Sequence, residues 1–246
     1  MTAPLLVVHP GPSRLITLTS GRLLTAVQDA IAARGEAHVA LTGGSMGSAV
    51  VAALTDHPAN DAVDWSRVHF WWGDERYLPA GDPDRNDTQN DDAGLRSLTT
   101  TSEKVHRVLG PDDVDSAEEA ARRYEEELRT HGNGTFDVVL LGVGPDGHVA
   151  SLFPGHPMQQ DTSGIAVAVH DSPKPPPTRV TLTAQCLSRS RQVWFIVSGQ
   201  DKAGAVAKGV ADAPAEQSST VLVRGQERTV WLVDEAAASG VGPVSG

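Results

Sequence analysis

Asp146 and His148 stand two positions apart in a glycine-rich turn, directly after the aliphatic run 138–141. Such a run is typical of a buried parallel strand, and open α/β sheets bind ligands beyond the carboxyl ends of their strands. Imidazole changes charge near neutral pH, and a nearby carboxylate can orient the ring. A lone histidine among glycines is more often structural, but this spacing predicts that Asp146 and His148 face a ligand.

A second stretch with chemical potential is Gly43-Gly44-Ser45, where a predicted strand meets a predicted helix. Glycines let backbone N–H groups approach a ligand, and the N-terminus of a helix favours an anion. The stretch lacks the lysine of a P-loop. It predicts a phosphate site, although an ordinary strand-to-helix turn explains the same residues equally well.

Charged side chains supply the remaining candidates. Asp74 and Arg76 follow a third predicted strand, where Asp74 suits ligand hydroxyls and Arg76 an anionic or carbonyl oxygen. A solvated salt-bridge cluster is the alternative reading of these two residues. The net charge is −11, so an anionic ligand would need specific cations, and Lys174, Arg179 and Lys202 are the candidates. Lys202 stands out because it follows a strand and a glycine turn and opens a helix.

A literal Gly-x-Gly-x-x-Gly occurs at Gly142, Gly144 and Gly147. A dinucleotide site of this kind needs a crossover helix directly after the glycines. Pro154 and Pro157 interrupt the chain within ten residues, so we interpret the match as coincidental. Because no companion histidine stands at metal-ligand spacing, we also expect no metal at His148.

The composition excludes several classes of protein. The acidic balance lacks the clustered Lys and Arg of a nucleic-acid surface. Apolar runs fall far short of the ~18 residues of a membrane span, and the N-terminus lacks the features of a signal peptide. A single cysteine, Cys186, fits a reducing cytoplasm. The sequence therefore predicts a cytoplasmic protein that acts on a small molecule.

Strand and helix patterns alternate from end to end. This order favours a mostly parallel sheet covered on both faces, and the absence of a linker favours a single domain over 1–246. We expect Ser13 to cap the first helix, Ser116 and Glu119 to form a capping box, and 79–92 to be a polar loop. Predicted strands are 5–9, 37–41, 67–72, 136–141, 165–170, 192–197 and 228–233, and predicted helices are 13–34, 45–54, 116–130, 183–190 and 201–210.

Five stretches together resemble the glucosamine-6-phosphate isomerase/6-phosphogluconolactonase family, in the family's order and across nearly the whole chain. The stretch 141–154 is long enough to be highly specific. The resemblance implies a Rossmann-like three-layer α/β fold, an enzyme of the pentose phosphate route and no cofactor. The matching stretches are Thr42-Gly43-Gly44-Ser45, Trp72-Gly73-Asp74-Glu75-Arg76, 141–154, Arg179-Val180-Thr181-Leu182-Thr183 and Ser198-Gly199-Gln200-Asp201-Lys202.

One feature separates the two branches of this family. The deaminase branch carries a glutamate for sugar ring opening after its Asp-Gly-His, whereas this chain has Ala150-Ser151-Leu152-Phe153-Pro154. The lactonase branch is therefore the expectation, with hydrolysis of 6-phospho-D-glucono-1,5-lactone to 6-phospho-D-gluconate. Alternatives are an isomerase/deaminase acting on glucosamine-6-phosphate and a non-catalytic phosphosugar sensor.

The expected mechanism assigns a role to each candidate. His148 is the general base on water, and Asp146 orients its ring. Arg76 or backbone N–H groups would stabilise the oxyanion, while the phosphate would lie against Gly43-Gly44-Ser45 with Arg179 and Lys202. A serine nucleophile, Ser45 or Ser151, is the competing chemistry, but neither stands in a nucleophile elbow.

Overall fold

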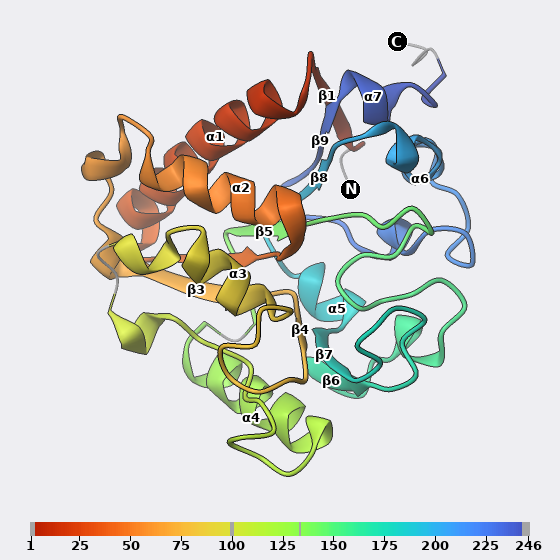
Figure 1. Cartoon of the computed structure of the whole chain (residues 1–246). Helices are drawn as coiled ribbons and strands as arrows, with labels where there is room; N and C mark the ends of the chain where they lie inside the picture. The colour runs from red at the N-terminus through yellow and green to blue at the C-terminus, as the bar shows by residue number, and fades with distance from the viewer. Residues whose placement is uncertain (1–2, 99–100, 133, 243–246) are drawn as a thin grey trace.

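A six-stranded parallel sheet forms the centre of the molecule in the computed structural model, which describes residues 3–98, 101–132 and 134–242 (Figure 1). Every neighbouring pair in the sheet is parallel, so the predicted fold class is confirmed. In spatial order the strands are β1 (Leu5–His9), β9 (Arg228–Asp234), β8 (Gln192–Val197), β5 (Val138–Leu141), β2 (Ala37–Leu41) and β3 (Val68–Trp72).

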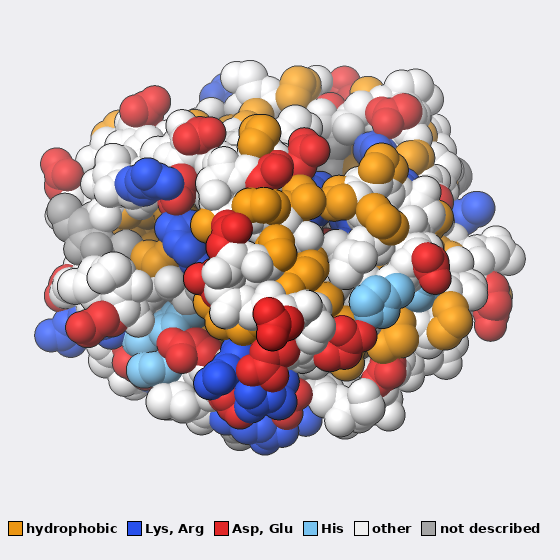
Figure 2. Space-filling view, turned by 60° about the horizontal axis from the view of Figure 1, so that its bottom comes forward, with side chains coloured by type: hydrophobic (Ala, Val, Ile, Leu, Met, Phe, Trp, Pro, Cys, Tyr) orange, Lys and Arg blue, Asp and Glu red, His pale blue; other side chains and the backbone are white. Residues whose placement is uncertain are grey.

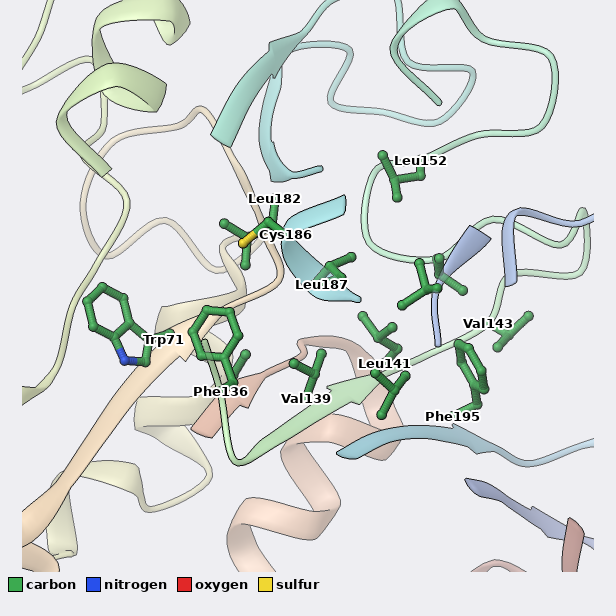
Figure 3. Close-up of a cluster of buried hydrophobic side chains, with 14 of the residues drawn as sticks. Trp71, Phe136, Val139, Leu141, Val143, Leu152, Leu182, Cys186, Leu187 and Phe195 are labelled. Atoms are coloured by element: carbon green, nitrogen blue, oxygen red, sulfur yellow. The ribbon is translucent and has the colours of Figure 1, made fainter. Parts of the chain in front are cut away.

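Alternate residues of each buried strand face opposite layers, as the two-residue period of a strand requires. In β5, Val138 and Leu140 pack toward α1 (Pro12–Arg34) and α2 (Gly44–Thr55). Val139 and Leu141 face the other way, with Leu182, Cys186 and Leu187 (Figure 3). The second layer contains α4 (Ala117–Thr130), α5 (Ala184–Leu187), α6 (Ala203–Val210) and α7 (Glu235–Ala238).

The outer face of α4 is covered by charged pairs. Arg122 pairs with Glu119 at 2.6 Å, and Arg129 pairs with Glu125 at the same distance. Figure 2, which brings this side of the molecule forward, shows blue and red side chains intermixed. Such exposed pairs contribute little to stability, so the helix is held mainly by its apolar face.

A second, antiparallel sheet lies beside the central one and consists of β4 (Asp74–Arg76), β7 (Arg179–Leu182) and β6 (Ala166–Val169). The first two strands are absent from the predicted set. Asp74-Glu75-Arg76 has no apolar alternation, and its strand conformation comes from pairing with β7, where Asp74 faces Thr181. Both strands bring polar side chains to the edge of the central sheet.

The ends of the helices test the local predictions. Gly11 rather than Ser13 caps α1, because Pro12 already occupies the first turn, where its missing N–H costs nothing. At α4, the Ser116 side chain accepts from the Glu119 N–H at 3.2 Å, which confirms one half of the predicted capping box.

The prediction of a loop over 79–92 is wrong for its second half, which forms α3 (Asn86–Asp92). The Glu75 carboxyl group accepts hydrogen bonds from the backbone N–H groups of Asn86 and Asp87, at 2.7 and 2.9 Å. The first N–H groups of this helix are therefore satisfied by a side chain that stands eleven positions before Asn86. Burial, with Asp87 nearby, raises the pKa of Glu75 to about 8.

The strand order places a switch point between β2 and β5. The chain leaves β2 toward β3 on one side, and leaves β5 toward β8 and β9 on the other. The loops after β2 and β5 therefore separate and leave a crevice, which is where ligands bind in such sheets.

None of the helices among the described residues combines the length and apolar character needed to cross a membrane.

Candidate active site

The turn after β5 brings Asp146 and His148 together. Its backbone closes through Gly144 N–H to the His148 carbonyl (3.0 Å) and Gly147 N–H to the Gly144 carbonyl (2.9 Å). Gly147 has a φ of +85°, which a side chain would strain. A Cβ on Gly144 would lie 2.1 Å from the His148 ring and 2.4 Å from the Asp146 carboxylate. Two glycines of the coincidental Gly-x-Gly-x-x-Gly thus let these two side chains meet.

The Asp146–His148 pair has a defined geometry. Asp146 Oδ1 lies 2.6 Å from His148 Nδ1, and the Phe153 ring packs against the imidazole with centroids 4.6 Å apart. The Lys174 ammonium lies 3.2 Å from the same Asp146 oxygen. Burial opposes ionisation of Asp146, but His148 and Lys174 outweigh it and hold the pKa of Asp146 well below its usual range. The carboxylate is therefore charged, and it can accept a hydrogen bond from a proton on His148 Nδ1.

The other ring nitrogen of His148, Nε2, has no hydrogen-bond partner among the described residues, and the ring borders a cavity of about 220 Å³. The cavity lies at the switch point between β2 and β5. It is lined by Thr42, Gly43, Gly44, Asp74, Arg76, Asn86, Gly142, Val143, Gly144, Pro145, His148, Ala150, Lys174, Arg179 and Lys202. Four of these side chains are cationic.

The glycine turn after β2 forms one wall of the cavity. Gly43 caps α2, which begins at Gly44, whereas Ser45 is exposed and does not line the cavity. A Cβ on Gly43 would lie 1.9 Å from Asn86 Oδ1, so only glycine allows α3 to approach this turn. The Gly44 N–H donates to Gln89 Oε1 at 2.9 Å. A phosphate at this turn would compete with Gln89 for that N–H.

Asp74 is held from two sides. Ser151 Oγ donates to Asp74 Oδ2 at 2.6 Å, and Asn86 Nδ2 donates to the Asp74 carbonyl at 2.7 Å and to Oδ1 at 3.3 Å. Arg179 Nη1 lies 3.8 Å from Asp74 Oδ2. Because Ser151 is fully buried and does not line the cavity, its hydroxyl has no access to a substrate there, which disfavours a nucleophilic role.

The predicted cations reach the cavity in different ways. Lys202 precedes α6 and pairs with Asp201 at 3.2 Å. Arg179 is 4% exposed, and its Nε and Nη2 donate to the carbonyls of 174–176 at 3.0–3.1 Å. Its Nη1 is the nitrogen left facing Asp74. Arg76 donates to the Asp84 carbonyl and also lines the cavity.

Two contributors, Asn86 and Phe153, were not among the predicted site residues. Asn86 sits in a polar segment that we expected to be a loop, and Phe153 lies within the motif but bears no polar group. Lys174 was one of several candidate cations, and only the fold places its ammonium 3.1 Å from His148 Nδ1. Its proline-rich surroundings gave no signal of that contact.

A separate cluster has metal-like spacing among the described residues: ligand atoms of Glu36, His38 and His69 lie within 4.8 Å of one another. However, the Trp71 indole N–H donates to His38 Nδ1 at 3.2 Å. An indole N–H can only donate, so the proton of neutral His38 lies on Nε2, the atom facing Glu36. The Lys104 ammonium lies 2.9 Å from His69 Nε2. Hydrogen bonds therefore already use the atoms that a metal would need.

The fold and the cavity define an α/β protein with a small-molecule site at the switch point of a parallel sheet. The chain belongs to the family described as glucosamine-6-phosphate isomerases/6-phosphogluconolactonase, whose sequence model matches residues 10–231.

Its relatives carry the lactonase name. The chain is 46% identical over 245 residues to the 6-phosphogluconolactonase of Streptomyces coelicolor, covering 96% of this chain and 94% of that protein. It is 41% identical over 227 residues to that of Mycobacterium leprae, covering 89% and 91%. The crystal structure of 6-phosphogluconolactonase from Thermotoga maritima superposes with a TM-score of 0.82 at 27% identity, covering 94% of this chain and 100% of that one.

Proposed function

We propose that this chain hydrolyses 6-phospho-D-glucono-1,5-lactone to 6-phospho-D-gluconate in the pentose phosphate pathway. The observation that carries the proposal is the Asp146–His148 pair, whose Nε2 has no protein partner among the described residues, beside a cavity with four cationic side chains. The lactonase names of the relatives and the absence of a carboxylate from 149–154 support the same reaction.

His148 performs the proton transfers. Neutral Nε2 takes a proton from water as the water oxygen bonds to C1, and the negative charge moves to the carbonyl oxygen. When the tetrahedral intermediate collapses, the bond between C1 and the ring oxygen breaks. The imidazolium returns its proton to that ring oxygen, and the new carboxylic acid loses a proton to solvent. Asp146 holds the Nδ1 proton and stabilises the imidazolium, as the carboxylate of a triad does.

Cationic groups serve the two negative ends of the substrate. The phosphate lies at the Gly43-Gly44 turn, where the backbone of α2 begins, with Lys202 and Arg179 nearby. Arg76, on the same cavity, offers charge to the oxyanion that forms at C1. Ser45 is exposed outside the cavity lining, so its backbone rather than its hydroxyl belongs to this proposal.

The proposed location in the cell rests on the single cysteine. We place the enzyme in the cytoplasm, because its single cysteine, Cys186, is a free and buried thiol. The whole chain acts as one lactonase domain on a small molecule, with no cofactor, metal ion or nucleic acid in the reaction.

The decisive test is a pH-stat assay with freshly made lactone, run with and without enzyme. Acid release well above the uncatalysed background supports the proposal, and a rate equal to background contradicts it. A parallel assay with glucosamine-6-phosphate addresses the isomerase/deaminase alternative, because release of ammonia would identify that reaction. A sensor would bind 6-phosphogluconate but release no acid from the lactone.

A further inference from the structure

Lys174 lies against the hydrogen bond that the proposed mechanism uses. Its ammonium is 3.2 Å from Asp146 Oδ1 and 3.1 Å from His148 Nδ1, while those two atoms are 2.6 Å apart. The backbone carrying Lys174 is fixed, because Arg179 donates to the carbonyls of 174–176. The side chain itself is 36% exposed. The loop is thus anchored, while the ammonium has room to move.

The position of this ammonium conflicts with proton transfer. An ammonium can only donate and a carboxylate can only accept, so Lys174 and the Nδ1 proton both bind Asp146. Once His148 takes a proton from water, its ring is cationic with a second cation 3.1 Å from Nδ1. Like charges at this distance disfavour the charged ring. In the ligand-free arrangement, Lys174 therefore opposes the first chemical step.

A ligand anion in the cavity would remove the conflict. Lys174 lines the same cavity as Lys202 and Arg179, the two cations proposed for the phosphate, so a phosphate there competes with Asp146 for the ammonium. Phosphate carries more charge than one carboxylate and offers more acceptor oxygens. Phe153, which packs against the imidazole, is apolar and does not change the charge balance. The imidazolium would then have Asp146 as its nearest charged partner.

We propose that Lys174 is a positioning residue through which the substrate phosphate activates His148. In the free protein its ammonium stays on the Asp146–His148 pair, and a bound phosphate draws it away. Specificity for phosphorylated lactones then resides in kcat as well as in KM. This inference rests on the proposed lactonase function, which the same experiment tests separately.

The kinetic test compares the wild type with Lys174→Met, which keeps a long side chain but removes its charge. Lys208→Met, on the exposed side of α6, is the matched control. The substrates are 6-phosphogluconolactone and phosphate-free glucono-1,5-lactone. In Lys174→Met we expect KM for the phosphorylated lactone to rise about tenfold or more, the size of one charged hydrogen bond. We expect kcat for the phosphate-free lactone to rise above that of the wild type.

Two kinetic outcomes overturn the inference. Equal losses of kcat on both lactones would mean that Lys174 acts on the reaction directly, and unchanged kcat values on both lactones would mean that it is only a surface ion pair. Lys174→Arg should restore most of the wild-type ratio, which a purely structural loss would not predict.

A second readout does not depend on lactone hydrolysis. Inorganic phosphate is titrated into the wild type and Lys174→Met while NMR follows the His148 ring signal across pH. Phosphate should move the ring's titration midpoint upward in the wild type and leave it in place in the variant. No response in the wild type overturns the inference even if the lactonase is active. A wild-type lactone rate equal to background rejects the proposed function, and the phosphate titration still decides the role of Lys174.

Discussion

Histidines lie at both edges of the central sheet, but they differ in what their ring nitrogens contact. At the carboxyl edge, His148 Nδ1 is hydrogen-bonded to Asp146, and the ring borders a cavity. Its Nε2 has no hydrogen-bond partner among the described residues. At the amino edge, His38 and His69 are partners in the register of β2 and β3, and their rings stack 4.4 Å apart. There, every ring nitrogen of His38, His69 and His106 has a partner.

The amino-edge cluster forms a directional chain of hydrogen bonds. Lys104 donates to His69 Nε2, His69 Nδ1 lies 2.8 Å from His106 Nε2, and His106 Nδ1 lies 2.8 Å from Glu127. Because Lys104 can only donate, these contacts assign one proton per ring and leave both rings neutral. Burial, which disfavours a charged ring, lowers the pKa of His69 to about 4, and the nearby His38 and Lys104 act in the same direction. An available lone pair beside a cavity, rather than a density of histidines, is therefore the feature on which the proposed role of His148 rests.

The largest expected effect comes from removing the imidazole at the carboxyl edge. His148→Ala should lower kcat for 6-phosphogluconolactone by about 10²–10⁴-fold, because the general base is lost. Binding of 6-phosphogluconate, measured by calorimetry, should stay close to that of the wild type. His170→Ala, at an exposed histidine paired with Glu118, is the control and should keep full activity. Full activity in His148→Ala would remove His148 from the mechanism.

The next effect concerns the partner of His148. Asp146→Asn keeps the size of the side chain but loses the charge that stabilises the imidazolium and can present an N–H to Nδ1. We expect kcat to fall by about 10²-fold or more, with a smaller change in KM. Steady-state kinetics across pH provide the measurement, and a kcat within twofold of the wild type would show that the ring needs no carboxylate.

A smaller effect belongs to the cations of the cavity. Lys202→Ala and Arg179→Ala should chiefly raise KM, by about tenfold for one charged contact. Arg179→Ala should also loosen the loop 174–176, whose carbonyls it holds, and so add a loss of kcat. Lys208→Ala is the matched control. An unchanged KM in both variants would place the phosphate elsewhere.

The smallest expected effect is the contribution of His69, at the amino edge, to the pH dependence of stability. His69 has a pKa of about 4 in the folded chain, against an ordinary value of 6.5. Above pH 6.5 the ring is neutral in both states and its stabilising contribution is complete. As pH falls from 6.5 toward 4 the unfolded chain binds the proton more readily, so the free energy of unfolding decreases. Melting temperatures should fall over this window and fall less in His69→Phe, and equal slopes would contradict this account.

Much of the fold was predictable because its strands are continuous apolar runs. Gln192–Val197 and Val138–Leu141 are buried on both faces, and their sequences show it directly. Asp74–Arg76 could not be predicted as a strand, since its conformation depends on pairing with β7, far along the chain. The start of α3 depends in the same way on the distant carboxyl group of Glu75.

The candidate site divides along the same line. Asp146 and His148 are close in sequence, so their contact follows from the local turn and from Gly144. Lys174 reaches them across 26 or more positions, through a loop that Arg179 holds. Local spacing can predict a contact between two residues of one turn. A third residue from another loop can be placed beside them only when the fold is known.

The most direct test of the central claim is the tautomer of His148, read by ¹⁵N NMR of the ligand-free chain at neutral pH. The account predicts a proton on Nδ1 and a free lone pair on Nε2 for His148, with the reverse arrangement for His38, whose Nδ1 accepts from Trp71. Addition of 6-phosphogluconate should shift the Nε2 signal of His148 and leave that of His38 unchanged. A proton on Nε2 of His148 would contradict its assignment as the base that receives the proton of water.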